Sequence, residues 1–177
     1  MIIKSTKTDT KGFTLIELLV VIAVIGILAT LVLLQLGIAR AKARDTKRIV
    51  DISQIRSAME LFYDDNNGHY PAQVDMSIIQ PYVPTLPQDP LLGQSCGNSF
   101  SGAASGTVNC YGYAWDPNSN PLHFQIWTEL EYSSNALSSD DDIDSTGWSG
   151  ALIDGSDEVD CYNDTPQDCI FDVGVAQ

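Results

Sequence analysis

Basic residues are missing from the last two thirds of the chain. After Arg56 the 177-residue sequence contains neither lysine nor arginine, whereas Ser57 to Gln177 carries nineteen Asp and Glu, and the net charge is −14. Such a surface is repelled by the phosphate backbone of nucleic acids, so no nucleic-acid partner is expected. An acidic surface attracts cations and basic partners, and it also keeps an exported protein soluble.

Residues typical of catalytic sites are also scarce. His69 and His123 are the only histidines, and neither has a Ser or Cys in a recognisable nucleophile motif nearby. No glycine-rich phosphate-binding loop is present. The sequence therefore predicts a protein that is not an enzyme and requires no cofactor.

The cysteines lack the CxxC spacing of zinc and redox sites. All four lie in the acidic part of the chain: Cys96, Cys110, Cys161 and Cys169. An even number predicts two disulfides and a location outside the reducing cytoplasm. Three pairings are open. Joining nearest neighbours closes the shortest loops, and each such bridge would stabilise the fold by roughly 3 kcal/mol.

One segment has almost no charge. Residues 13–39 read FTLIELLVVIAVIGILATLVLLQLGIA, and Glu17 is the single charged residue. About 20 apolar residues suffice to cross the hydrocarbon core as a helix. The fifteen Leu, Ile and Val residues between Leu15 and Leu34 each favour insertion by about 0.3–0.6 kcal/mol, which together exceeds the roughly 3 kcal/mol cost of one carboxylate. The segment is therefore predicted to span a membrane once.

Two ordinary explanations of this segment fit less well. A secretory signal has an apolar region of about 7–15 residues followed by an A-x-A-like cleavage site. This run is longer, and no such site follows before Arg40. A plain membrane anchor does not account for Glu17, because an acid inside a membrane segment is functional by default and needs a partner.

The residues KGFTLIE at positions 11–17 resemble the prepilin processing signal of type IV pilins and type II secretion pseudopilins. The resemblance implies that a prepilin peptidase removes residues 1–12 by cleaving between Gly12 and Phe13. It also implies N-methylation of the new terminus at Phe13, and a filament-core role for residues 13–39. Many family members have a proline where this chain has Leu34, so a kink there is not implied.

The resemblance also implies an assembly role for Glu17, the fifth residue of the mature chain. Its carboxylate would meet the positive N-terminus of a neighbouring subunit as that subunit docks. Each charge alone is costly in an apolar filament core, whereas the pair attracts strongly, so the correct register is favoured. The implied partners are identical or related pilin subunits, the peptidase, the assembly platform and its ATPase, and the membrane.

Charges on the two sides of the span do not agree with the orientation that we expect. Lys4, Lys7 and Lys11 precede it, but five bases follow between Arg40 and Arg48. A positive-inside count would leave the C-terminal domain in the cytoplasm. We expect the opposite, because long domains translocate regardless of charge and because the cysteines and acidity favour the outside. The subunit is thus expected in the inner membrane with an extracytoplasmic head, and its filament in the periplasm or at the cell surface.

Residues 40–67 predict a continuation of the same helix as an amphipathic stalk. No Pro or Gly occurs before Gly68, which is placed as a C′ cap, and Pro71 prevents continuation. Apolar side chains recur at steps of three and four: Ile49, Ile52, Ile55, Met59 and Phe62. A coiled-coil dimer is the alternative to an intramolecular core face, but two heptads are fewer than it needs.

Charged residues of the stalk predict pairs along the helix: Lys47–Asp51, Asp45–Arg48 and Arg48–Asp51. The basic cluster from Arg40 to Arg48 is able to bind phosphate headgroups or DNA. We interpret it instead as a solvated juxtamembrane collar that also pairs with acidic domains of neighbouring subunits.

Residues 68–177 predict a β-rich, disulfide-containing acidic head. The Leu-Pro-x-Asp-Pro element at residues 86–90 also resembles pseudopilin and pilin heads. Strands are predicted at Tyr111–Trp115 and His123–Glu131 as an antiparallel hairpin, and further ones near Ala151–Ile153 and Cys169–Val173. The expected fold is α+β and type IV pilin-like, with the long N-terminal helix packed on a small antiparallel sheet.

The acidic loops of the last forty residues are candidates for a calcium site, because calcium favours six to eight oxygen ligands from flexible loops. The candidate ligands are Asp140, Asp142, Asp144, Asp154 and Asp157. An EF-hand that starts at Asp142 fails, since its twelfth residue is Ile153. Resemblance to type II pseudopilins, which hold calcium in a C-terminal loop, supports calcium, and solvated acidic loops are the alternative.

The features together predict a structural subunit that polymerises through its N-terminal helix. A type II secretion pseudopilin is preferred. A type IV pilus subunit, major or minor, is the first alternative, with adhesion or motility as its role. A membrane-anchored extracytoplasmic binding module is the second, although it would not need Phe13 or Glu17.

Overall fold

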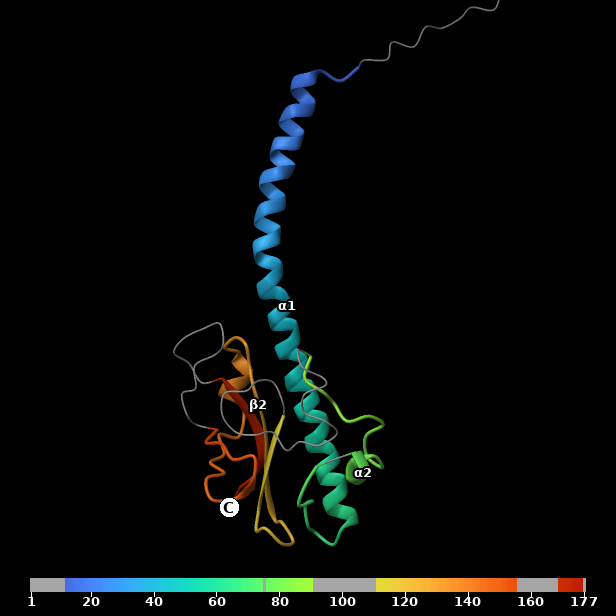
Figure 1. The fold of residues 1–177 in the computed structure, drawn as a ribbon, viewed down its shortest axis with the longest axis vertical. Helices are drawn as coiled ribbons and strands as arrows, with labels where there is room; N and C mark the ends of the chain where they lie inside the picture. The colour runs from blue at the N-terminus through green and yellow to red at the C-terminus, as the bar shows by residue number, and fades with distance from the viewer. Residues whose placement is uncertain (1–11, 75, 91–110, 156–168, 177) are drawn as a thin grey trace, which may run out of the picture. The chain divides into compact units, whose positions relative to one another are not determined.

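The structure of the protein is a computed structural model that describes residues 12–74, 76–90, 111–155 and 169–176. The chain forms two compact units whose boundary falls between Ala39 and Arg40. Helix α1, Leu15–Asp65, runs through this boundary without interruption for 51 residues. The predicted single long helix is therefore confirmed (Figure 1).

The first half of α1 exposes its apolar side chains on every side. Leu15, Ile22 and Leu33, for example, are 81%, 61% and 69% exposed. This part of the helix is long and apolar enough to cross a membrane. No described residue of this unit covers these side chains, and apolar surface of this extent is typical of a face that lipid or other protein chains cover.

The end of α1 differs from the prediction by two residues. The helix ends at Asp65, not at Asn67. Asn67 takes the left-handed conformation with φ 57°, and Gly68 follows with φ 76° and donates its N–H to the Tyr63 carbonyl at 3.0 Å. This is a Schellman closure, in which Asn67 occupies the C′ position predicted for Gly68.

Four strands form one antiparallel sheet in the order β3-β1-β2-β4. The strands are β1 (Gly112–Asp116), β2 (His123–Glu129), β3 (Ser149–Gly150) and β4 (Ile170–Val175). The predicted hairpin is confirmed, with Gly112 opposite Trp127 and Asp116 opposite His123.

Other elements of the head match the sequence less closely. The strand expected near Ala151–Ile153 is present just before this range, as β3, and Asp154 forms only an isolated bridge with Asp144. The expected strand near Cys169–Val173 is present as β4. The short helices α2 (Met76–Ile79) and η1 (Asn135–Ser138) were not predicted.

The second half of α1 packs on the sheet through its apolar stripe. Ile52, Ile55 and Met59 are completely buried and join one core with the sheet residues Tyr113, Phe124, Ile126 and Val173. The intramolecular core face is thus confirmed. The opposite face of β2 is buried too, because Trp127 packs with Ala151 and Ile170 and donates its indole N–H to the Ala151 carbonyl at 2.9 Å.

Candidate functional site

The predicted processing signal lies at the start of α1. Phe13 is 91% exposed, and the helix begins two residues later at Leu15. The Glu17 carboxylate accepts from the Thr14 backbone N–H at 2.8 Å and from the Thr14 hydroxyl at 2.7 Å. The Glu17 N–H in turn approaches the Thr14 hydroxyl oxygen at 3.3 Å.

These bonds make a capping box, which is signalled by the T-x-x-E spacing of residues 14–17 but was not among the features predicted. The box fixes where α1 starts and holds the Glu17 carboxylate at the positive end of the helix dipole. It places this acid beside the backbone of Phe13 and Thr14, where the new N-terminus would form. Cleavage after Gly12, methylation of Phe13 and the assembly role of Glu17 stay predictions.

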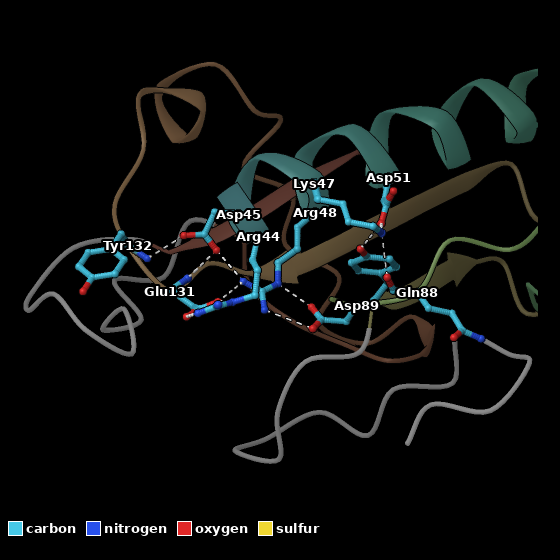
Figure 2. A network of polar contacts seen from close by, with 10 residues as sticks. Arg44, Asp45, Lys47, Arg48, Asp51, Gln88, Asp89, Glu131 and Tyr132 are labelled. Atoms are coloured by element: carbon cyan, nitrogen blue, oxygen red, sulfur yellow. Dashed lines mark hydrogen bonds and ion pairs between the residues drawn. The ribbon is translucent and has the colours of Figure 1, made fainter. Parts of the chain in front are cut away.

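A buried network of charges is the second site, and Figure 2 shows it at the start of the amphipathic half of α1. Arg48 is completely buried. Its guanidinium donates to both carboxylate oxygens of Asp89, at 2.5 and 3.2 Å, and to Asp45 at 2.6 Å and Glu131 at 3.0 Å. Three carboxylates from three parts of the chain therefore converge on one cation.

Arg44 and Asp45 extend the network to the segment that follows β2. Arg44 donates to both oxygens of Glu131, at 2.6 and 2.5 Å. Asp45 accepts the backbone N–H groups of Glu131 and Tyr132, at 3.0 and 3.1 Å. The hydrogen bond from Arg44 holds the pKa of Glu131 below its usual range despite partial burial.

Lys47, Asp51 and Tyr111 form the other end of the network. Lys47 is ion-paired with Asp51 and donates to the Gln88 carbonyl at 3.0 Å. The Tyr111 hydroxyl donates to the same carboxylate oxygen of Asp51 at 2.6 Å. Burial, together with this hydrogen bond to a carboxylate, raises the pKa of Tyr111 far above its ordinary value.

The network corrects the predicted role of the basic cluster. Arg44, Lys47 and Arg48 are committed to partners within the chain, so they do not belong to a free collar. The pairs Lys47–Asp51 and Asp45–Arg48 are confirmed. The predicted pair Arg48–Asp51 is wrong, because Arg48 turns into the head, where Asp89 and Glu131 offer stronger, buried contacts.

The acidic loop after η1, residues 140–144, is hydrogen-bonded to the edge strand β4. Asp172 of β4 is fully buried and accepts N–H groups from Asp142 at 3.0 Å and Ile143 at 2.9 Å. In return the Asp141 carboxylate accepts the Gly174 N–H at 2.9 Å. Because an edge strand exposes unpaired backbone groups, Asp141 satisfies one N–H of β4, whereas Asp172 binds the backbone of the loop. Asp172 was missed, since its alternating strand pattern gives no sign of a buried acid.

The five candidate calcium ligands are only partly placed. Asp142 and Asp144 are exposed, whereas burial raises the pKa of Asp140 to about 7. The part of the chain that the structure describes contains no group of three or more acidic, His or Cys side chains suited to a metal ion. Asp157 lies outside the described residues. Calcium binding therefore stays a prediction.

The disulfide framework is seen at one position. Cys169, just before β4, is completely buried and disulfide-bonded. The other three predicted disulfide residues, Cys96, Cys110 and Cys161, lie outside the described residues. The pairing stays a prediction.

Comparison with known proteins agrees with the N-terminal signal. The family model of the prokaryotic N-terminal methylation motif matches residues 7–33. Type II secretion system core protein G of Pectobacterium carotovorum is 38% identical over 96 residues, covering 45% of this chain and 61% of the relative. The protein of the same name in Aeromonas hydrophila is 35% identical over 100 residues, 48% of this chain and 69% of the relative.

A pilus protein is among the relatives as well. The type IV wide pilus major component PilA4 of Thermus thermophilus is 43% identical over 61 residues, 34% of this chain and 47% of the relative. The matches thus span about half to two thirds of these relatives. No solved structure matches significantly. With its methylation motif, its long N-terminal helix on an antiparallel sheet and these relatives, the chain belongs to the family of type IV pilins and type II secretion pseudopilins.

Proposed function

We propose that this chain is a pseudopilin, a structural and non-catalytic subunit of the filament of a type II secretion system. The observation that carries the proposal is the apolar first half of α1, which begins within the methylation motif and whose side chains no described residue covers. The relatives named type II secretion system core protein G favour this machine.

Assembly would transfer residues 13–39 from lipid to the protein core of the filament. Before assembly, lipid covers the exposed side chains, and the subunit is held in the inner membrane with its head outside the cytoplasm. In the filament, the same side chains pack on other copies or related subunits. The Glu17 carboxylate then leaves its Thr14 partners for the methylated N-terminus of a neighbour, because two opposite charges in an apolar core attract strongly.

The proposal includes the partners that such assembly needs. A prepilin peptidase would cleave between Gly12 and Phe13, and an assembly platform with its ATPase would extract subunits from the membrane. The filament would lie in the periplasm. No enzymatic activity is assigned to the chain itself.

Processing and assembly are tested separately. Mass spectrometry of the purified protein should show a chain that starts at methylated Phe13; a chain that starts at Met1, or one cut after Ala39, would contradict the proposal. Glu17→Val should leave membrane insertion intact and abolish filaments, since the charge pair is lost. Gln35→Leu, which removes the other strongly polar side chain of the span, is the control and should assemble normally.

A type IV pilus is the second candidate, favoured by the relative named as a wide pilus component. Deletion of the gene separates the two. Loss of protein secretion with surface pili intact supports the pseudopilin, whereas loss of surface pili with secretion intact supports the pilin.

A further inference from the structure

The basic residues of the second compact unit, residues 40–177, differ in whether they are ion-paired within the chain. Of the six Lys and Arg residues that the structure describes, four are ion-paired within the chain: Arg44, Lys47, Arg48 and Arg56. Arg40 and Lys42 are exposed and form no ion pair with any residue of the described ranges. The free positive charge of this part of the molecule is thus reduced to one short stretch of α1.

A groove lies beside this stretch. On α1 it is lined by Lys42, Asp45, Thr46 and Ile49, which share one helix face, and opposite them by residues 132–135. Its volume is about 340 Å³.

The polar lining of the groove leaves one charge without a partner. The Asp45 carboxylate is already used by Arg48 and by the N–H groups of Glu131 and Tyr132 (Figure 2). The remaining polar groups are the hydroxyls of Thr46, Tyr132, Ser133 and Ser134 and the amide of Asn135. Lys42 therefore supplies the unpaired charge, and a polar segment that carries a carboxylate is the complementary occupant.

We propose that this groove, with Lys42 in its lining and the free base Arg40 two residues earlier on α1, receives an acidic loop from the head of a second copy of this chain. The inference rests on the proposed filament function and names the surface through which neighbouring heads attract each other.

Charge complementarity favours a second copy as the occupant. Each chain has a net charge of −14, with nineteen acids and no base after Arg56, so two heads repel each other over most of their surfaces. Arg40 and Lys42 are the described bases that are free to relieve this repulsion. A second copy also offers suitable carboxylates in Asp142 and Asp144, which are exposed and have no ion pair among the described residues.

The test uses the full-length chain in a strain that assembles its filament. Arg40→Glu/Lys42→Glu should lower filament yield about tenfold, because it places like charges face to face. Leader cleavage and membrane insertion should be unchanged, since both substitutions lie beyond the apolar span. Arg40→Lys/Lys42→Arg keeps the charge and should assemble as the wild type does.

A charge exchange identifies the occupant. Asp142→Lys/Asp144→Lys alone should also lower the yield, and its combination with Arg40→Glu/Lys42→Glu should restore filaments. Normal filaments from Arg40→Glu/Lys42→Glu, or no restoration in the combined variant, would overturn the inference. So would a loss confined to binding of vesicles of anionic lipid, which would assign the two bases to headgroups. Failure of the wild type to be processed or to form filaments would instead contradict the proposed function.

Discussion

Arg48 and Asp89 form a bidentate ion pair in which both side chains are fully buried. Arg48 Nε lies 2.5 Å from Asp89 Oδ2, and Arg48 Nη2 lies 3.2 Å from Asp89 Oδ1. Arg48 belongs to the long helix, and Asp89 lies in the proline-rich segment 41 residues further along the chain. The attraction within a buried pair is largely offset by the cost of removing both charges from water. The main consequence of the pair is structural specificity. Only when the proline-rich segment packs in this one position on α1 are both buried charges paired.

Loss of Arg48 should destabilise the head strongly. Arg48→Met removes the guanidinium that binds both oxygens of Asp89 and one of two cations that bind Glu131, and we expect a loss of about 3–5 kcal/mol. Denaturation of the full chain in detergent micelles, followed by tryptophan fluorescence, measures this, since all three Trp residues lie in the head. Arg40→Met is the matched control on the same helix and should leave the curve unchanged. Equal curves for the two variants would contradict the network.

The hydroxyl of Tyr111 should contribute measurably to stability. Tyr111→Phe removes the buried hydrogen bond to Asp51, and a bond to a charged group contributes about 1.5–3 kcal/mol. The same denaturation experiment measures the effect. Tyr82→Phe is the control, because the Tyr82 hydroxyl also donates to a carboxylate, that of Asp65, but at an exposed site. Tyr111→Phe should clearly lower the free energy of unfolding, and Tyr82→Phe should change it little. A larger loss for Tyr82→Phe would contradict our explanation.

Stability of the head should fall as pH rises from about 4 to about 7. Burial raises the pKa of Asp140 to about 7 and also raises that of Asp172, whereas an unfolded Asp titrates near 3.9. Between these values the folded chain holds protons that the unfolded chain releases, so the free energy of unfolding decreases with pH. Glu131 acts in the opposite sense, because its pKa is lowered, and its contribution is lost only below its ordinary range.

Melting temperatures of the full chain between pH 4 and pH 7.5 test this dependence. Asp140→Asn should flatten the slope, since the substituted side chain binds no proton. Asp64→Asn, at an exposed position near the end of α1, should keep the slope of the wild type. A slope that Asp140→Asn leaves unchanged would refute the assignment.

Calcium binding by the acidic loops predicts a rise in melting temperature with millimolar calcium, because an ion that binds the folded state stabilises it. Asp142→Asn/Asp144→Asn should remove this rise, and a chelator should reverse it in the wild type. Magnesium, which demands stricter octahedral geometry, is the control ion. Absence of any shift, in calorimetry as well as in melting, would contradict calcium binding by these residues and leave them as solvated acids.

The sequence by itself determined the parts of this protein that depend on local pattern. The apolar run of residues 13–39, with its single acid at Glu17, and the apolar stripe from Ile49 to Phe62 are local features of one helix. They correctly predicted α1 and the buried face of its second half. The hairpin of β1 and β2 followed from two short strands with a turn between them.

The tertiary structure alone decided which charges are free. Arg40, Arg44 and Arg48 look alike in the sequence, yet burial against Asp89 and Glu131, which are distant along the chain, neutralises the last two and leaves Arg40 exposed. A buried cation is costly unless partners surround it, and those partners come together only when the sheet packs on the helix. For the same reason no local pattern marked Asp172 as buried, since its partners, the backbone of Asp142 and Ile143 and the side chain of Gln125, are distant along the chain.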